Sequence, residues 1–310
     1  MEGADLNVPA LVTFRTEVSR PGLCAKITDD AQTARPNTVG ASNEEREMPD
    51  LQQLAAILPV MVSYTVPYPG MDTNPEGWEC IKVALRSFHE HFPDRKVLVV
   101  DNDSDDPAND PKRAWLHAYP GAIVLRNPLT RNAEFWEAHH PRRHQHHGNG
   151  IDCGVDHCRR HSVPYMLHFE PDCIVSGTSW LEAMWQCIAE GAWMTGINCC
   201  NHSSEIIHVC PSLWSVDTPA CEPSFARQPI EDDRKHPRFE ELTRFSGTAR
   251  TWDRWDTGQK NWWVAALAGR ARWAQPVRDD FEHYGAGSGY AGLSTVRERV
   301  GCERMKKYLR

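Results

Sequence analysis

Two carboxylates, Glu170 and Asp172, directly follow an apolar segment that is typical of a buried strand, Y-M-L-H-F at 165–169. Only Pro171 separates them, and its ring stiffens the turn. Because a buried carboxylate is costly unless a cation or hydrogen-bond donors compensate it, we expect this pair at a strand end facing positive charge. Carboxylate oxygens there can hold a hard divalent cation, which in turn holds a diphosphate. A solvated or helix-capping pair is the alternative.

A second pair of acids follows another apolar segment. Asp101 and Asp103 come after K-V-L-V-V at 96–100, which is also typical of a buried strand. In sheets of parallel strands, ligands bind at the carboxyl ends of the strands. The two acidic pairs therefore predict one ligand site at that edge.

The elements that must position these acids alternate between strand and helix. Strands are predicted at 57–66, 97–100, 122–127 and 165–169, and helices at 78–92, 107–115, 150–161 and from Ser179 on. Ile81, Leu85 and Phe88 lie at helical spacing in the first helix, and Ser179 with Glu182 fits a capping box. This alternation predicts an α/β fold with a mostly parallel central sheet flanked by helices.

The composition limits the possible classes of protein. The 310 residues suffice for one large domain, and a net charge of −8 argues against a protein that binds duplex nucleic acid. We expect a flexible extension at 1–50 and a single domain at 51–310. No run of eighteen apolar residues occurs, so we expect no membrane span and a cytoplasmic location.

Cysteine and histidine are frequent, with 11 Cys and 15 His. The odd, irregularly spaced cysteines indicate reduced thiols, and the group at 199–210 lacks the paired C-x2-C spacing of a structural zinc site. We therefore expect packed cysteines.

The order of four motifs resembles family 2 GT-A glycosyltransferases. They are P-V-M-V-S-Y-T, V-V-D-N-D-S-D-D, H-G-N-G-I-D-C-G-V and M-L-H-F-E-P-D, and the similarity spans roughly Pro59 to Leu181. The resemblance implies a single GT-A domain, with a nucleotide-sugar-binding half at 51–198 and an acceptor-binding half at 199–310.

The resemblance implies roles for the two acidic pairs. Asp101 matches the acid that reads the nucleobase, and Asp103 is expected beside the nucleoside. Asp172 matches the second acid of the D-x-D motif, which binds the metal. Glu170 replaces the first acid, which commonly contacts the ribose, and its longer side chain changes the contact geometry.

Three further residues are expected to bind the donor. Asp152 resembles an acid that often faces the donor, and the alternative is a helix-surface residue near the first turn. Arg142 and Arg143, in the run E-A-H-H-P-R-R-H-Q-H-H-G, have planar donors that suit a diphosphate. A solvated loop is the other interpretation of that run.

Two late residues complete the site that the resemblance implies. Asp256, in R-W-D-T-G-Q-K-N-W-W, resembles the catalytic base that takes the acceptor's proton, and the alternative is a helix N-cap. His283 resembles the histidine that completes the metal shell, and the alternative is a residue of a flexible glycine-rich loop. An imidazole suits manganese better than magnesium. Trp262 and Trp263 fit either an acceptor subsite or the core.

The sequence therefore predicts a Mn²⁺- or Mg²⁺-dependent inverting glycosyltransferase. It would move a sugar from a nucleotide-diphosphate donor, with UDP-sugar favoured, to a small-molecule or glycan acceptor. A sugar nucleotidyltransferase would want a glycine-rich, basic loop after the first strand, where this chain has Y-T-V-P-Y-P-G-M-D. A binding module without turnover is the non-enzymatic alternative. The oligomeric state is left open.

Overall fold

The computed structural model divides the chain into two units, Met1–Arg46 and Glu47–Arg310, and all described residues belong to the second. Of residues 79, 143–146 and 231–232 only the backbone is described. The described ranges are 54–63, 79–102, 110–127, 143–198, 206–207, 210–227, 231–243, 257–283 and 307–308.

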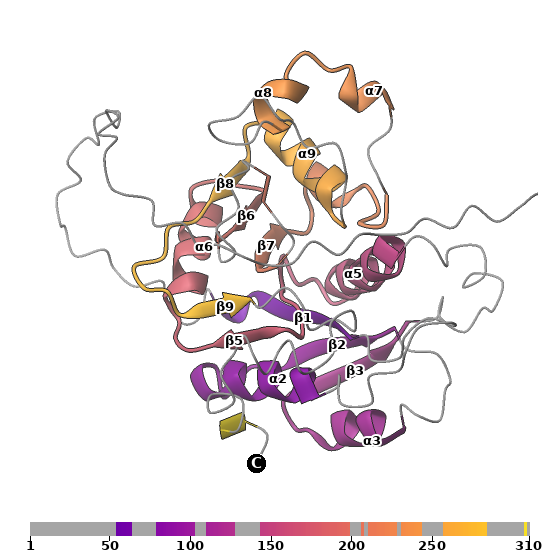
Figure 1. Cartoon of the computed structure of the whole chain (residues 1–310), viewed down its shortest axis with the longest axis vertical. Coiled ribbons are helices and arrows are strands. Elements are labelled where there is room, and N and C mark those ends of the chain that lie inside the picture. The colour runs from indigo at the N-terminus through magenta and orange to yellow at the C-terminus, as the bar shows by residue number, and fades with distance from the viewer. Residues whose placement is uncertain are drawn as a thin grey trace, which may run out of the picture. The chain divides into compact units, whose positions relative to one another are not determined.

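A seven-stranded sheet forms the centre of the described unit (Figure 1). The strands are β1 (Ile57–Ser63), β2 (Val97–Asp101), β3 (Ala122–Arg126), β4 (Tyr165–His168), β5 (Cys173–Val175), β6 (Met194–Gly196), β7 (Ser212–Ser215), β8 (Ala271–Trp273) and β9 (Phe281–His283). The order across the sheet is β3-β2-β1-β4-β7-β6-β8, while β5 and β9 form a separate two-stranded ribbon.

Most neighbouring strands of the central sheet are parallel. The pairs β1–β2, β2–β3, β1–β4 and β6–β8 are parallel, and β7 runs antiparallel to both β4 and β6. The predicted fold class is confirmed in its broad form: an α/β fold with a mostly parallel central sheet flanked by helices. The short strands β6 and β7 were not predicted, because three or four residues give too little alternation to read.

Helices cover both faces of this sheet. They are α2 (Glu79–His91), α3 (Asp110–Ala118), α5 (Arg143–Arg160), α6 (Ser179–Ala189), η3 (Pro219–Cys221), α7 (Glu231–Arg234), α8 (Phe239–Thr243) and α9 (Gln259–Leu267). Val97 and Val99 of β2 pack into one buried cluster with α2 and α6, and Leu98 and Val100 pack into a second with α5 and α9. Burial on both faces explains why β2 is apolar from Val97 to Val100. None of the helices in these ranges is both long and apolar enough to cross a bilayer.

Helix α5 begins seven residues before the predicted start at Gly150, so the part of the histidine-rich run from 143 on is helical and the solvated-loop interpretation is wrong there. The true start of the helix could not be predicted from the sequence, because the glycines in it lower helix propensity. Two of them permit close packing. A Cβ on Gly148 would lie 2.2 Å from the backbone N of Ala226, and one on Gly154 would lie 2.7 Å from Cγ1 of Val60.

The carboxylate of Asp152 fastens α5 to the turn at 224–225. The backbone N–H of Phe225 donates to Oδ1 at 2.8 Å, and the Ser224 hydroxyl donates to Oδ2. Burial raises the pKa of Asp152 from 3.8 to about 6, although both hydrogen bonds act in the opposite direction. Asp152 is thus held by the protein's own donors.

Helix α6 begins with a cap from a distant segment. The predicted capping box of Ser179 and Glu182 is wrong: Thr178 is the N-cap residue, and Glu182 accepts a hydrogen bond from its hydroxyl at 2.6 Å. The buried carboxylate of Asp280 accepts from the backbone N–H groups of Ser179 and Trp180, at 2.9 and 3.2 Å. A local motif could not reveal a cap supplied 100 residues away.

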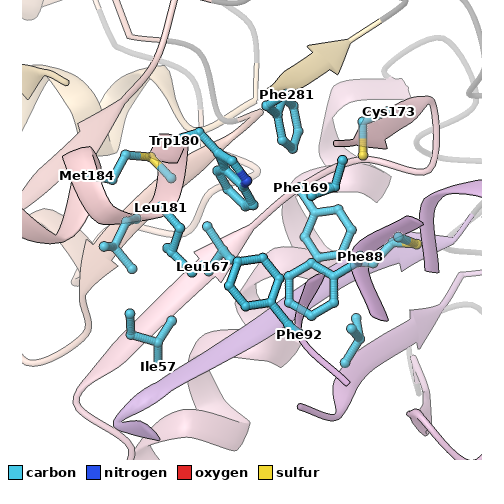
Figure 2. Close-up of a cluster of buried hydrophobic side chains, with 14 of the residues drawn as sticks. Ile57, Phe88, Phe92, Leu167, Phe169, Cys173, Trp180, Leu181, Met184 and Phe281 are labelled. Atoms are coloured by element: carbon cyan, nitrogen blue, oxygen red, sulfur yellow. The ribbon is translucent and has the colours of Figure 1, made fainter. Parts of the chain in front are cut away.

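The ribbon of β5 and β9 is anchored by aromatic packing. The rings of Phe281 and Trp180 lie 4.7 Å apart, and both side chains are fully buried beside Phe169 and Phe88 (Figure 2). In the antiparallel register Val175 pairs with Phe281, and Cys173 with His283. The packing of Phe281 therefore fixes where His283 lies.

Replacement of Phe281 by alanine should destabilise the fold by roughly 3–5 kcal/mol, as a large core deletion does. Urea unfolding would measure it. Val277→Ala is the control, because Val277 is 93% exposed and its loss should change stability by under about 0.5 kcal/mol. Equal effects of the two substitutions would contradict the anchoring role.

Asp152→Asn should stabilise the protein in a pH-dependent way. The raised pKa means that the protonated carboxyl favours the folded state below about pH 4, and that this contribution is lost as the pH rises through about 6. The neutral amide can still accept from the Phe225 N–H through its oxygen, and its NH2 group can donate to the Ser224 hydroxyl oxygen in a reversed hydrogen bond. The variant should therefore gain roughly 1–3 kcal/mol over the parent at pH 7 and little at pH 4. Urea unfolding at both pH values measures the difference.

The exposed Asp94, in the turn after α2, provides the control substitution Asp94→Asn, which should change stability by under about 0.5 kcal/mol at both pH values. A stability gain from Asp152→Asn that is the same at pH 4 and pH 7 would contradict the burial argument.

Candidate metal and donor site

The carboxyl ends of three central strands meet at one edge of the sheet. β1 lies between β2 and β4 and runs parallel to both, with Ser63 paired to Asp101 and Val60 paired to His168. Glu170 and Asp172 follow β4 by two and four residues. The strand ends that the sequence marked with acids therefore face the same edge, where α/β sheets bind ligands.

Asp172 and His283, the two predicted metal ligands, are brought into contact. Nε2 of His283 lies 3.1 Å from Oδ1 of Asp172 and 3.1 Å from Oε2 of Glu170. The Asp172 side chain is 1% exposed, against 17% for Glu170 and 13% for His283. One imidazole nitrogen and two carboxylates thus converge on a mostly buried point.

The β5–β9 ribbon produces this convergence across 111 residues of sequence. Asp172 directly precedes β5, and His283 ends β9, opposite Cys173 in the antiparallel register. The alternative that His283 belongs to a flexible loop is wrong, since it lies in a paired strand.

Cys210 is a site residue that the sequence analysis missed. Its Sγ accepts a hydrogen bond from the backbone N–H of Glu170 at 3.2 Å. One ligand atom each of Glu170, Cys210 and His283 all lie within 4.8 Å of one another. Burial raises the pKa of the Cys210 thiol to about 12, so without an ion it is protonated. The loose Cys/His group at 199–210 was the available signal, but its spacing fits no zinc motif.

Two more histidines, His147 and His168, lie in contact with each other near Glu170. Nε2 of His147, on α5, is 3.3 Å from Nε2 of the fully buried His168 and 3.9 Å from Oε1 of Glu170. At 3.3 Å one imidazole donates its N–H and the other accepts it. These rings place additional titratable groups beside the carboxylate pair.

The donor set fits a divalent cation. Carboxylate oxygens are ligands for both Mg²⁺ and Mn²⁺, while an imidazole favours Mn²⁺ or a later transition metal. The close approach of Glu170 and Asp172 to one nitrogen also places two negative groups where a cation would compensate both. The residues present therefore fit the metal that the resemblance implies.

Asp101 lies in a buried ion pair. Its Oδ1 is 2.8 Å from Nζ of Lys112, whose ammonium also donates to the Ser63 hydroxyl at 3.2 Å. The two charged side chains are 2% and 1% exposed, and burial lowers the pKa of Lys112 to about 8. In this structure Asp101 thus ties α3 to β1 and β2, a role other than the nucleobase contact that the resemblance implies.

The remaining predicted site residues are distributed as follows. Arg143 is the first residue of α5 and its side chain lies outside the described part of the chain, as do Asp103, Arg142 and Asp256 entirely. The N-cap residue of α9 is Gly258, in the left-handed region with φ 71°, so the alternative that Asp256 caps this helix is wrong. Trp262 and Trp263 are 2% and 1% exposed and belong to the core, which removes them as an acceptor subsite.

The sequence matches no protein-family model and no curated protein. Some solved structures are similar to this chain. The galactosyltransferase LgtC, solved with donor and acceptor sugar analogs, is 11% identical; the match covers 81% of this chain and 94% of LgtC with a TM-score of 0.42.

Two other solved structures match a smaller part. A cytidylyltransferase from Leptospira borgpetersenii is 10% identical over 52% of this chain, with a TM-score of 0.30. The mannosyltransferase PcManGT from Pyrobaculum calidifontis, solved with GDP-Man and Mn²⁺, is 13% identical over 52%, with a TM-score of 0.34. The chain spans 60% of the cytidylyltransferase and 44% of the mannosyltransferase. The function of this chain must be argued from its own side chains.

Proposed function

We propose that this chain is a metal-dependent inverting glycosyltransferase that uses a nucleotide-diphosphate sugar, with UDP-sugar favoured, and a small-molecule or glycan acceptor. One observation carries the proposal. Asp172 and Glu170 each lie 3.1 Å from Nε2 of His283, at the sheet edge that the carboxyl ends of β1, β2 and β4 share.

Asp172 and His283 are the residues that would hold the cation, and Glu170 lies close enough to join them. A divalent cation held there would neutralise the charge that develops on the diphosphate as the glycosidic bond breaks. The β5–β9 pairing keeps His283 in place, so the ligands are preorganised before a donor arrives. Mn²⁺ suits this set better than Mg²⁺ because of the imidazole.

Asp256 is the proposed base toward the acceptor. Its carboxylate would take the proton of the acceptor hydroxyl as that oxygen attacks the anomeric carbon. The bond from the anomeric carbon to the diphosphate breaks on the opposite face, and the nucleoside diphosphate leaves with the bonding electrons. Attack from that face gives inversion. Support comes from the motif in which Asp256 lies, three residues before α9.

Product analysis separates this function from its rivals. Incubation with nucleotide sugars and Mn²⁺ should release the nucleoside diphosphate, slowly to water and faster to the true acceptor. Release or uptake of pyrophosphate would instead identify a sugar nucleotidyltransferase. Metal-dependent binding with neither product would identify a binding module.

Asp172→Asn should abolish Mn²⁺ binding, because the amide loses the charge that the cation needs. The affinity loss measured by calorimetry should exceed the roughly 10- to 100-fold loss that is typical of a group which only orients a ligand. Asp94→Asn is the matched control at an exposed carboxylate after α2. Unchanged Mn²⁺ affinity in Asp172→Asn would remove Asp172 from the metal site.

Asp256→Asn should leave donor affinity unchanged and lower the rate of transfer by about 10²- to 10⁴-fold, the usual contribution of a positioned base. Donor binding by calorimetry and transfer to the acceptor are measured side by side, with Asp253→Asn as the control in the same segment. Full turnover of Asp256→Asn would exclude it as the base.

A further inference from the structure

The candidate metal site contains a sulfur atom. Sγ of the buried Cys210 lies within 4.8 Å of a carboxylate oxygen of Glu170 and of a ring nitrogen of His283. Asp172 also reaches Nε2 of His283, at 3.1 Å. Glu170 and His283 thus have two different third partners, one hard carboxylate and one soft thiol.

Hydrogen bonding holds this sulfur in position. The backbone N–H of Glu170 donates to Sγ at 3.2 Å, which ties the thiol to the residue whose side chain lines the site. Hydrogen bonds from backbone N–H groups to a ligating sulfur are a common means by which proteins tune a bound metal. Cys210 thus has both the contacts of a core residue and the position of a ligand.

We propose that Cys210 is a metal ligand, so that Glu170, Cys210 and His283 form a site for a thiophilic divalent cation such as Zn²⁺ or Co²⁺. The inference rests on the proposed function, since it concerns the identity of the ion at the same site. On binding, the thiol releases its proton to solvent and the sulfur ligates as thiolate. Three protein ligands leave a coordination position open, as in catalytic zinc sites.

Because Glu170 and His283 can be joined by either Asp172 or Cys210, we expect different ions to depend on different third ligands. A hard ion such as Mn²⁺ should depend on Asp172, and Zn²⁺ or Co²⁺ should depend on Cys210, because thiolate raises affinity for the softer ions. Cys210→Ser should therefore weaken Co²⁺ binding at least tenfold and change Mn²⁺ binding by less than about threefold. Asp172→Asn should show the opposite order of losses.

Optical titration of the metal-free full-length protein with Co²⁺ alone tests the proposal directly. One equivalent should produce a near-ultraviolet sulfur-to-cobalt charge-transfer band in the parent. The band should be absent in Cys210→Ser and retained in Cys200→Ser and Cys221→Ser, which remove other thiols. Absence of the band in the parent, or its persistence in Cys210→Ser, would overturn the assignment.

A second measurement needs no variant, in case Cys210→Ser fails to fold. X-ray absorption of the zinc-loaded parent should show one sulfur at about 2.3 Å among nitrogen and oxygen ligands at about 2.0–2.2 Å. A shell of nitrogen and oxygen alone would refute the sulfur ligand. If Mn²⁺-dependent donor binding persists without sulfur ligation, the inference fails and the proposed function stands. If sulfur ligates the metal but no nucleotide sugar binds, the inference stands and the proposed function fails.

Discussion

The site depends on holding two carboxylates close to one imidazole in a mostly buried place. Asp172 and Glu170 each lie 3.1 Å from Nε2 of His283, and all three side chains are largely shielded from solvent. Like charges this close, and this poorly solvated, are unfavourable unless a positive group lies between them. A protonated imidazole or a bound cation meets that need, and only the cation adds chemistry. The rest of the architecture follows from keeping His283 at that point.

Three contacts distant in sequence hold the ribbon that carries His283. The antiparallel pairing of β5 with β9 sets its register, and Phe281 packs against Trp180 at a ring distance of 4.7 Å. Asp280, the residue before β9, caps α6 through two backbone N–H groups. Helix α6 also packs against the central sheet. These contacts therefore fix the position of His283 relative to the sheet, which also positions Glu170 and Asp172. Preorganisation of this kind is what a metal site requires.

Local sequence patterns predicted the longer strands and helices of the alternating α/β part. The apolar run before Asp101 and the stripe that includes Ile81 gave β2 and α2, since burial on both faces or on one stripe is visible in a single segment. The motif resemblance drew attention to Asp172 and, through the separate segment F-E-H-Y-G-A-G-S-G, to His283, and the structure places these two side chains in contact. Cys210 and the Asp280 cap were not predictable, because each depends on a contact between segments 40 or more residues apart. Lys112 lies only 11 residues from Asp101, but their ion pair depends on how α3 packs against the sheet, which no local pattern shows.

The most direct measurement is anomalous diffraction from crystals grown with a uridine diphosphate sugar and Mn²⁺, recorded at the manganese absorption edge. We expect one strong peak between Asp172 and His283, within about 2.0–2.4 Å of a ligand atom of each, in contact with the diphosphate. A peak elsewhere on the chain, or nucleotide bound with no ion beside its phosphates, would contradict this expectation.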